Sequence, residues 1–533
     1  MNYLNTITKL PPIQSALQVL GRLPAIQQLI EICSNSSRKE LAVLGAASFL
    51  TLYNLIRYIR ERREKLNLPP KVPFSLPLIG HTLYLCLASN RFLDLCADRY
   101  GEIFRIDHLG QTMTVVNGRC AEEAMKADSA DLSLEFGILR DVLFLHYVFD
   151  DDTMKIGFHV NPVVAKNTIS NKKVPDYIPG IQKGLERAVS HLLNQNGEPT
   201  LVSNPNVFLQ QFVAYMSVPT LVGYEVATNS EVIKSFADFT GDITGNISIL
   251  LSVPKVLHPM ILPYLQYLHK HQKVMEKHVV PVINNRRKVM REAELAGKEH
   301  GLPENFLQGL IEFKKKEQDG AEHFYPADAI SRTVLLIAFA SVHTTSMNLS
   351  FCLYWLLARP DLMQAIVEEI ERVLPGNTTV NAVTLSEMTT MNNFVREVLR
   401  QGVDKLANGK KAMKDYTFYN GYQVTKGELV QSSLRQLTFG SNSNRSDIDE
   451  MDPNMSLNKP STTPAKDFVS FGMGKHLCPG RFFAVQEIQM SLVYLLKHFK
   501  IETADGKRPA PVKYFAGTIA VNNNSPLLFT PKK

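Results

Sequence analysis

The hydrophobic and polar positions divide the chain into a short apolar run near the N-terminus and a long body of helix-period segments. From about residue 90 onward, apolar residues recur three and four positions apart, which is typical of amphipathic helices. Strand-like segments are brief, at 103–107, 113–116 and 416–425, and Asn420-Gly421 in the last one predicts a tight hairpin turn. The pattern therefore predicts a mainly α protein with small β-sheets.

Two helices stand out in this body. The first is expected to begin at Pro326, a favoured first-turn residue, and to end at Ala358, before Arg359-Pro360. It is apolar on nearly every face, which predicts a buried central helix, and the polar residues at 341–348 argue against a membrane span. The hydroxyl groups among these polar residues could mark a functional site, or they could donate back to carbonyls of the preceding turn. The second helix is expected to run from about Arg481 to Phe499.

The apolar run near the N-terminus, residues 41–56, carries no charge, and five basic residues follow it: Arg57, Arg60, Arg62, Arg63 and Lys65. Its length is close to that of a membrane-spanning helix, and basic residues after it predict that the body lies in the cytoplasm. An ordinary buried helix is the alternative. We expect residues 1–40 to form an interfacial N-terminal segment, 41–58 a transmembrane anchor, 59–80 a basic and proline-rich hinge, and 81–533 one large domain.

Charge and cysteine content exclude several classes of protein. The net charge is +7, from 58 basic and 51 acidic residues. So small an excess over so long a chain does not indicate a nucleic-acid-binding protein, and it suits a basic docking face or an anionic membrane surface. Six cysteines without CxxC spacing argue against a disulfide framework or a structural zinc site.

One cysteine lies in an unusual setting. Residues 471–484 read FGMGKHLCPGRFFA, and Cys478 comes just before the predicted helix, whose positive N-terminal end favours a thiolate. The glycines of this stretch are expected to allow backbone conformations and close approaches that side chains would block: Gly472, Gly474 and Gly480. A thiolate in such a turn is a candidate ligand for iron. A buried cysteine beside a turn would explain the thiol but not the surrounding spacing.

The stretch resembles the heme-binding signature of the cytochrome P-450 family, F-x-x-G-x-[RH]-x-C-x-G-x-x-x-A, at every defined position. The matching residues are Phe471, Gly474, His476, Cys478, Gly480 and Ala484. The resemblance implies that Cys478 is the metal ligand of heme b, that His476 lies near a heme propionate, and that Phe471 packs over the sulfur. It also implies the P-450 fold, with heme between the long central helix and the cysteine-loop helix. The whole pattern resembles that of fungal microsomal members of the family.

A second segment, AFASVHTTS at 338–346, resembles the oxygen-binding segment of the family's central helix. Ala340 and Thr344 are four apart and share a helix face. The resemblance implies that Ala340 leaves room above the heme and that Thr344 delivers protons to dioxygen. His343 stands where the family usually has an acid, and Ser341 where it has a glycine. His343 is expected either to titrate near neutrality or to be a hydrogen-bonded core residue.

Two further positions follow the family's order. Glu397 and Arg400 match its E-x-x-R pair and would form a structural lock behind the heme pocket. The usual third member, an arginine, has no match, and residues 452–458 occupy its place. Lys410 stands where the family commonly has a propionate-binding arginine. The helix that usually supplies a tryptophan and an arginine to the propionates offers only His159 and Lys166.

The resemblance implies a heme-thiolate monooxygenase domain over 81–533, which inserts one atom of dioxygen into an apolar terpenoid, steroid or lipid-like molecule. Electrons would come from NADPH through a reductase that docks near Lys475 and Arg481. The expected location is the endoplasmic reticulum membrane, single-pass, in contact with membrane lipid and with the catalytic domain in the cytoplasm. Two alternatives remain open: a heme-thiolate isomerase or dehydratase of the same fold, and a non-catalytic heme- or sterol-binding protein.

Overall fold

The structure is a computed structural model, and it describes residues 66–532 apart from short internal stretches. These stretches are 77–78, 109, 195, 252–256, 317–320, 377, 404, 441–450, 458, 510–512, 516–518 and 522–523. The expected interfacial segment, the expected anchor and residues 59–65 of the expected hinge lie outside the described residues. Residues Leu68–Lys533 form one compact unit.

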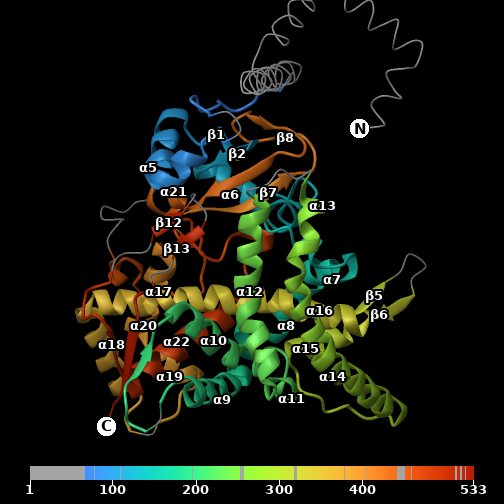
Figure 1. The fold of residues 1–533 in the computed structure, drawn as a ribbon, viewed down its shortest axis with the longest axis vertical. Coiled ribbons are helices and arrows are strands. Elements are labelled where there is room, and N and C mark those ends of the chain that lie inside the picture. Colours follow the sequence, from blue (N-terminus) through green and yellow to red (C-terminus); the bar gives the residue numbers. More distant parts are fainter. Residues whose placement is uncertain are drawn as a thin grey trace, which may run out of the picture. The chain divides into compact units, whose positions relative to one another are not determined.

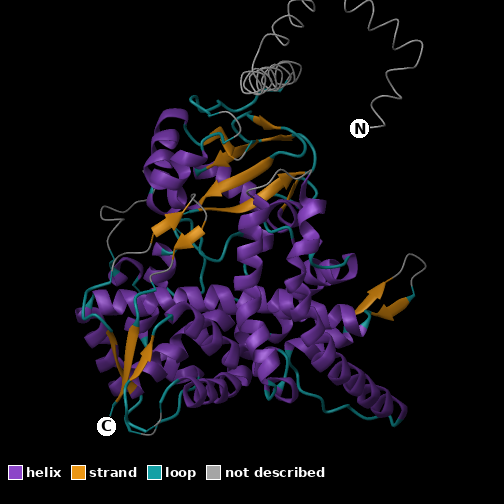
Figure 2. Ribbon diagram, in the orientation of Figure 1, coloured by secondary structure: helices purple, strands orange, loops and turns teal. Residues whose placement is uncertain are grey.

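The predicted mainly α fold with small sheets is confirmed (Figure 2). The α-helices are α5 Thr82–Tyr100, α6 Gly118–Lys126, α7 Asp151–Lys155, α8 Asn161–Thr168, α9 Val174–Leu192, α10 Pro205–Leu221, α11 Tyr224–Ala227, α12 Ser230–Leu251, α13 His258–Ile261, α14 His269–Leu295, α15 Phe306–Glu312, α16 Ala327–Ala338, α17 Thr344–Ala358, α18 Pro360–Val373, α19 Ala382–Glu387, α20 Thr389–Gln401, α21 Leu434–Phe439 and α22 Arg481–His498. Short π and 3-10 turns are η1 Glu135–Val142, η2 Leu145–Tyr147, η3 Ile156–Val160, η4 Asn171–Lys173, η6 Leu262–Leu268, η7 Phe339–His343, η8 Pro453–Ser456 and η9 Gly474–His476.

The strands form small sheets around these helices. They are β1 Ile103–His108, β2 Gln111–Val116, β3 Leu132–Ser133, β4 Thr200–Val202, β5 Lys314–Lys316, β6 Glu322–Phe324, β7 Leu406–Ala412, β8 Tyr416–Thr417, β9 Gln423–Val424, β10 Leu429–Ser433, β11 Phe499–Thr503, β12 Lys513–Phe515, β13 Ile519–Val521 and β14 Leu527–Pro531. The largest sheet has the order β1-β2-β10-β7-β3, and a second has the order β11-β14-β4. The hairpin predicted at Asn420-Gly421 is confirmed, because β8 pairs with β9 and Gly421 has a φ of 83°.

The central helix lies across the unit as α16, η7 and α17 (Figure 1). It begins after Pro326 and ends at Ala358, as predicted, but a π-helical turn at Phe339–His343 interrupts the α-helical pattern. Among the described residues, 327–358 is the only helix long and apolar enough to cross a membrane, yet more than half of it is buried inside the protein. It is therefore a core helix.

The helix that follows the cysteine loop, α22, packs against α9, α17 and α20. It ends at His498, one residue earlier than predicted, because Phe499 opens β11 and pairs with Pro531. Arg286 lies on α14, in a stretch rich in charged residues. Its guanidinium is buried, and its Nε donates to Glu225 Oε1 over 3.0 Å.

The proline-rich segment after residue 68 is extended, as its composition predicted. Its backbone runs along β1: the N–H of Val72 donates to the carbonyl of Arg105 over 2.9 Å, and the N–H of Arg105 donates to that of Pro70 over 2.8 Å. The segment thereby joins the sheet edge of the unit that carries the candidate site.

Candidate functional site

The loop that carries Cys478 is closed by its own backbone. The N–H of Cys478 donates to the carbonyl of Phe471 over 2.9 Å, and the N–H of Leu477 donates to that of Gly474 over 3.2 Å. Gly472 and Gly474 have φ values of 75° and 64°, a region that glycine adopts without strain. A Cβ on Gly474 would lie 3.2 Å from the Cα of Lys126, so this glycine also lets the loop approach the end of α6.

Gly480 neither adopts the special backbone conformation nor makes the close approach that the sequence predicted for it. Its φ is −85°, and a Cβ there would meet only Ile169 at 3.7 Å, which is an ordinary contact. Gly480 instead caps α22, where its carbonyl accepts the N–H of Ala484 over 2.9 Å. The described protein atoms therefore give no steric reason for glycine at position 480.

Burial dominates the electrostatics of Cys478. It raises the pKa of the thiol, while the backbone N–H groups of Gly480 and Arg481 and the charge of Arg481 act in the opposite direction. The helix end thus acts toward the thiolate, as expected, but burial outweighs it. A bound metal cation would supply the missing stabilisation, because a coordinating thiol is deprotonated outright.

Two small side chains in the middle of the central helix are exposed, although several of their neighbours are buried. Ala340 and Thr344 are exposed, whereas Val342, Thr345 and Ser346 between and beside them are buried. The hydroxyl groups bond back along the helix, as the structural alternative predicted: Thr344 Oγ1 donates to the carbonyl of Ala340 over 2.6 Å. Ala340 and Thr344 are therefore four residues apart on one accessible face of the central helix.

His343, beside this face, is a neutral imidazole. Burial and the charge of Lys405 lower its pKa to about 4, so it does not titrate near neutrality. Its Nδ1 is buried and has no hydrogen-bond partner in the described part of the chain. The structure therefore agrees with neither expectation: His343 does not titrate near neutrality, and its Nδ1 is not hydrogen-bonded.

The two predicted propionate ligands, Lys410 and His476, lie near each other. The charge of Lys410 contributes to lowering the pKa of His476, and burial is the larger cause. Lys410 is buried, which lowers its pKa to about 8, and its Nζ donates to the carbonyls of Met125 and Ala127 over 3.1 and 3.2 Å. His476 Nε2 is 3.1 Å from Ser129 Oγ. Both side chains thus contact the chain between the end of α6 and Ser129.

Glu397 and Arg400 form a buried bidentate ion pair on α20. The Nε and Nη2 atoms of Arg400 donate to the two carboxylate oxygens over 2.7 and 2.6 Å, and both side chains are fully buried. Gln401 adds a third donor to Glu397 over 3.0 Å. The guanidinium of Arg400 also lies over the ring of Phe439, 4.7 Å from its centroid. Such a pair is stable only while both partners are present.

Arg396, which the sequence reasoning missed, ties α20 to the segment before the cysteine loop. Its Nη1 donates to the carbonyls of Pro460 and Thr463 over 2.7 and 2.8 Å, and its guanidinium lies 3.8 Å from the ring centroid of Phe468. The only signal in the sequence was an arginine next to Glu397.

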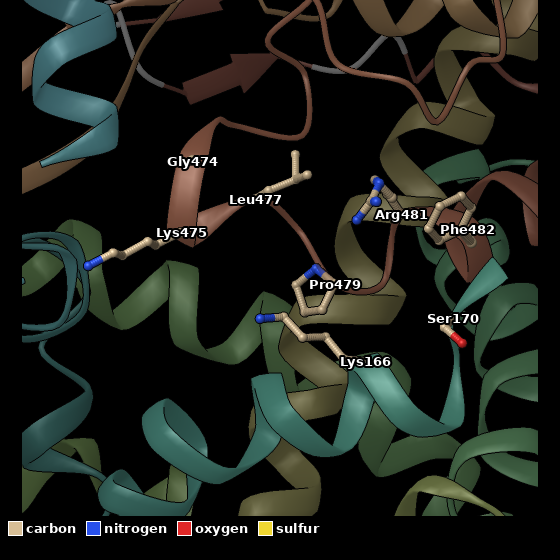
Figure 3. Close-up of a pocket in the computed structure, with 8 residues that line it drawn as sticks. All are labelled: Lys166, Ser170, Gly474, Lys475, Leu477, Pro479, Arg481 and Phe482. Carbon is tan, nitrogen blue, oxygen red and sulfur yellow. The ribbon is translucent and has the colours of Figure 1, made fainter. Parts of the chain in front are cut away.

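A pocket of about 390 Å³ lies beside the cysteine loop (Figure 3). It is lined by Lys166, Ser170, Gly474, Lys475, Leu477, Pro479, Arg481 and Phe482. Lys166 extends from α8 beneath Pro479. Lys475 pairs with the exposed Asp128 over 2.6 Å, and His159 is exposed and lies 3.8 Å from Glu135. Of the two residues considered on 158–166, Lys166 thus reaches the loop.

These residues fit a heme held by a thiolate. Cys478 offers a soft sulfur ligand, and the face of Ala340 and Thr344 leaves accessible space on a helix that packs against α22. Lys410 and His476 lie close enough to each other that both could face the propionates of one heme. Fold and site together define the class of heme-thiolate proteins.

Comparison with known proteins gives the family. The cytochrome P450 family model matches residues 70–529. Cytochrome P450 monooxygenase 151 of Postia placenta is 23% identical over 91% of this chain and 98% of its own length. Cytochrome P450 monooxygenase penP of Penicillium crustosum is 25% identical, with 79% and 81% covered, and cytochrome P450 monooxygenase CYP512U6 of Ganoderma lucidum is 24% identical, with 78% and 82% covered. The chain belongs to the cytochrome P450 family and is an oxidoreductase with heme as its cofactor.

Proposed function

We propose that this chain inserts one atom of dioxygen into an apolar terpenoid, steroid or lipid-like molecule, with electrons from NADPH delivered by a reductase. The exposed pair Ala340 and Thr344, in the middle of the buried central helix, carries the proposal. A methyl group and a hydroxyl on that face leave room for a small reactant and place a proton-conducting group beside it.

The heme would be held by Cys478 through its sulfur, with Lys410 and His476 facing its propionates. When bound, it supplies the activation of dioxygen, and a thiolate ligand favours O–O cleavage. The carbonyl of Phe471 holds the backbone of Cys478 in place by accepting its N–H. Gly474 lets the loop pack against α6, and the small Gly480 and Ala484 are proposed to line the heme at the first turn of α22.

Protons would reach the site through Thr344, whose hydroxyl already donates to the carbonyl of Ala340. His343 is neutral at neutral pH, so it does not take the role of the family's usual acid. A neutral imidazole can accept a proton at one nitrogen and release one from the other. We therefore assign His343 to relaying protons toward Thr344 rather than to storing one.

The pocket beside the cysteine loop supports docking of the reductase there. Lys166, Lys475 and Arg481 give this surface a positive character, and a surface of that sign steers an acidic partner. Arg481 also donates to the carbonyl of Cys478 over 2.9 Å, so the docking surface is connected to the backbone of the iron ligand.

The elements near Ala340 and Thr344 favour an apolar substrate. Helix α12 packs against the π turn η7, and its buried residues include Phe239, Ile243 and Ile247. An apolar molecule gains about 25 cal/mol for each Å² of its surface that is removed from water. Location in the endoplasmic reticulum membrane, with residues 41–58 as the anchor and 81–533 in the cytoplasm, belongs to the same proposal.

The test is reconstitution with an NADPH-dependent reductase and a panel of terpenes, steroids and fatty acids. The proposal predicts substrate-dependent NADPH consumption and one oxygen atom from isotopically heavy dioxygen in the product. An isomerase or dehydratase would convert a peroxide substrate without NADPH, and a non-catalytic binding protein would convert nothing. Either result would contradict the proposal.

A further inference from the structure

Helix α22, which follows the cysteine loop, is joined to α10 by polar contacts in the middle of the core. Ser217 on α10 donates its hydroxyl hydrogen to Glu487 Oε1 over 2.7 Å. One turn further along α22, the hydroxyl of Ser491 donates to the carbonyl of Glu487 over 2.6 Å and lies 3.4 Å from Met216 Sδ on α10. All four residues are fully buried. The carboxyl group of Glu487 is therefore part of the contact between the two helices.

Helix α9 brings a second polar group to the same part of α22 (Figure 1). The ring of the buried Tyr177 packs edge-on against Phe483, with centroids 5.3 Å apart, and Phe483 lies one turn before Glu487 on the same face of α22. The hydroxyl of Tyr177 and Oε2 of Glu487 are both buried, and neither has a hydrogen-bond partner in the described part of the chain. An internal water between them would give both atoms a partner.

Glu487 has no cationic partner among the described residues. The buried titratable groups on the elements packed against α22 are Tyr177 on α9, Cys352 and Tyr354 on α17, Glu369 on α18, and Arg396, Glu397 and Arg400 on α20. The two arginines bond elsewhere: Arg396 donates to backbone carbonyls and Arg400 donates to Glu397. Burial raises the pKa of Glu487 well above its ordinary value, and the hydrogen bond from Ser217 acts in the opposite direction. A buried carboxylate without a cation is costly, so the neutral acid is the stable form.

We infer that Glu487 is a positioning residue: as a neutral carboxylic acid it holds α22, and with it the backbone of Cys478, against α9 and α10. Its Oε1 accepts the hydrogen of Ser217, and its protonated Oε2 donates toward Tyr177 through an internal water. The link to the cysteine is short, because Arg481 in the first turn of α22 donates to the carbonyl of Cys478 over 2.9 Å. The inference rests on the proposed function, in which Cys478 is the iron ligand.

Glu487→Gln tests the protonation state, because the amide also accepts at one atom and donates from the other but does not ionise. The folded holoenzyme should keep the Glu487 proton between about pH 5 and pH 7, whereas the unfolded chain, with a glutamate pKa of about 4.3, releases it. The urea unfolding constant of the wild type, relative to that of Glu487→Gln, should therefore rise about tenfold for each pH unit. Groups that both proteins share, His343 among them, affect both alike.

Glu371→Gln, at an exposed carboxylate on α18, is the matched control. Its unfolding constant should follow that of the wild type over the same pH range. A ratio between wild type and Glu487→Gln that does not change with pH would overturn the inference, because it would show that Glu487 is not held as the neutral acid.

Glu487→Met tests the positioning, because the thioether fills a similar space but neither accepts from Ser217 as a carboxyl does nor donates toward Tyr177. In the carbon monoxide difference spectrum of the holoenzyme at neutral pH, Glu487→Met should show several-fold less of the thiolate band, whereas Glu487→Gln should keep the wild-type spectrum. A full thiolate band in Glu487→Met, or loss of the band in Glu487→Gln, would overturn the positioning role.

If Glu487→Met does not fold, the pH dependence of Glu487→Gln decides the matter. Failure of the proposed function gives a different result: the wild type itself then lacks the thiolate band, and the ratio of unfolding constants still measures the protonation of Glu487.

Discussion

Arg400 and Glu397 form a bidentate ion pair in the fully buried space behind the cysteine loop, with N–O distances of 2.7 and 2.6 Å. Helical spacing places the two residues on one face, and Gln401 and the ring of Phe439 complete their surroundings. The pair holds α20 rigid where α20 meets the segment that leads into the cysteine loop.

Arg400→Ala is predicted to destabilise the protein by about 3–5 kcal/mol, because it leaves the Glu397 carboxylate buried and uncompensated. The free energy of unfolding in urea and the heme content after purification measure the effect. The control is Arg372→Ala, whose side chain is two-thirds exposed and lies 3.8 Å from Glu369. Equal stability of Arg400→Ala and the wild type would show that the pair is not a structural lock.

Thr344→Ala is predicted to leave folding intact and to impair proton delivery. The hydroxyl bonds only back along its own helix in the described structure, so its loss should change stability by about 1 kcal/mol or less. Product formed per NADPH should fall roughly ten- to a hundredfold, with hydrogen peroxide released instead. Thr344→Ser should retain most of the coupling. Full coupling in Thr344→Ala would remove Thr344 from the mechanism.

His343 is predicted to make the protein sensitive to acid. Its pKa is about 4 in the folded state and about 6.5 in the unfolded state, so the unfolded state binds the proton more readily between these values. The contribution of neutral His343 to the free energy of unfolding is fully present above pH 6.5 and is lost as the pH falls toward 4. At pH 5 the loss is about 2 kcal/mol.

Denaturant titrations at pH 7 and pH 5 measure this loss. His343→Gln should reduce the difference between the two pH values, whereas His159→Gln, at an exposed histidine, should leave it unchanged. If His343→Gln is as sensitive to acid as the wild type, His343 is not the neutral buried group described here.

Lys475→Glu is predicted to weaken the reductase interaction without affecting the fold. The Lys475–Asp128 pair is exposed, so its loss should not measurably change the unfolding midpoint. The apparent KM for the reductase should rise several-fold at low salt, and the difference from the wild type should shrink as salt is added. Lys298→Glu, on an exposed stretch after α14, is the control. An unchanged KM would place the docking surface elsewhere.

Local sequence patterns predicted the fold where local interactions determine it. The ends of the central helix at Pro326 and Ala358 and the Asn420-Gly421 hairpin follow from residue types at fixed spacing. The π turn at 339–343 has no such pattern. Long-range contacts have no such pattern either: Arg286 pairs with Glu225, 61 positions away, and the contacts of Arg396 with Pro460 and Thr463 span a similar number of positions.

The site was predictable as a set of residue types but not in its electrostatics. The motifs brought Cys478, Thr344, Lys410 and the Glu397–Arg400 pair to attention, and family order gave each a role. Burial reverses what sequence proximity suggested: it raises the pKa of Cys478 despite the helix end, and it lowers that of His343 to about 4. Solvation depends on the whole core, so it could not be predicted from the sequence around either residue.

The most direct test of the central claim, that Cys478 holds the heme iron as a thiolate, is the carbon monoxide difference spectrum of the reduced protein. The wild type should show the red-shifted Soret band of thiolate ligation, and Cys86→Ala, at a half-buried cysteine on α5, should show it unchanged. Cys478→Ala should lose the band. A wild type without the band, or a Cys478→Ala variant that keeps it, would contradict the assignment.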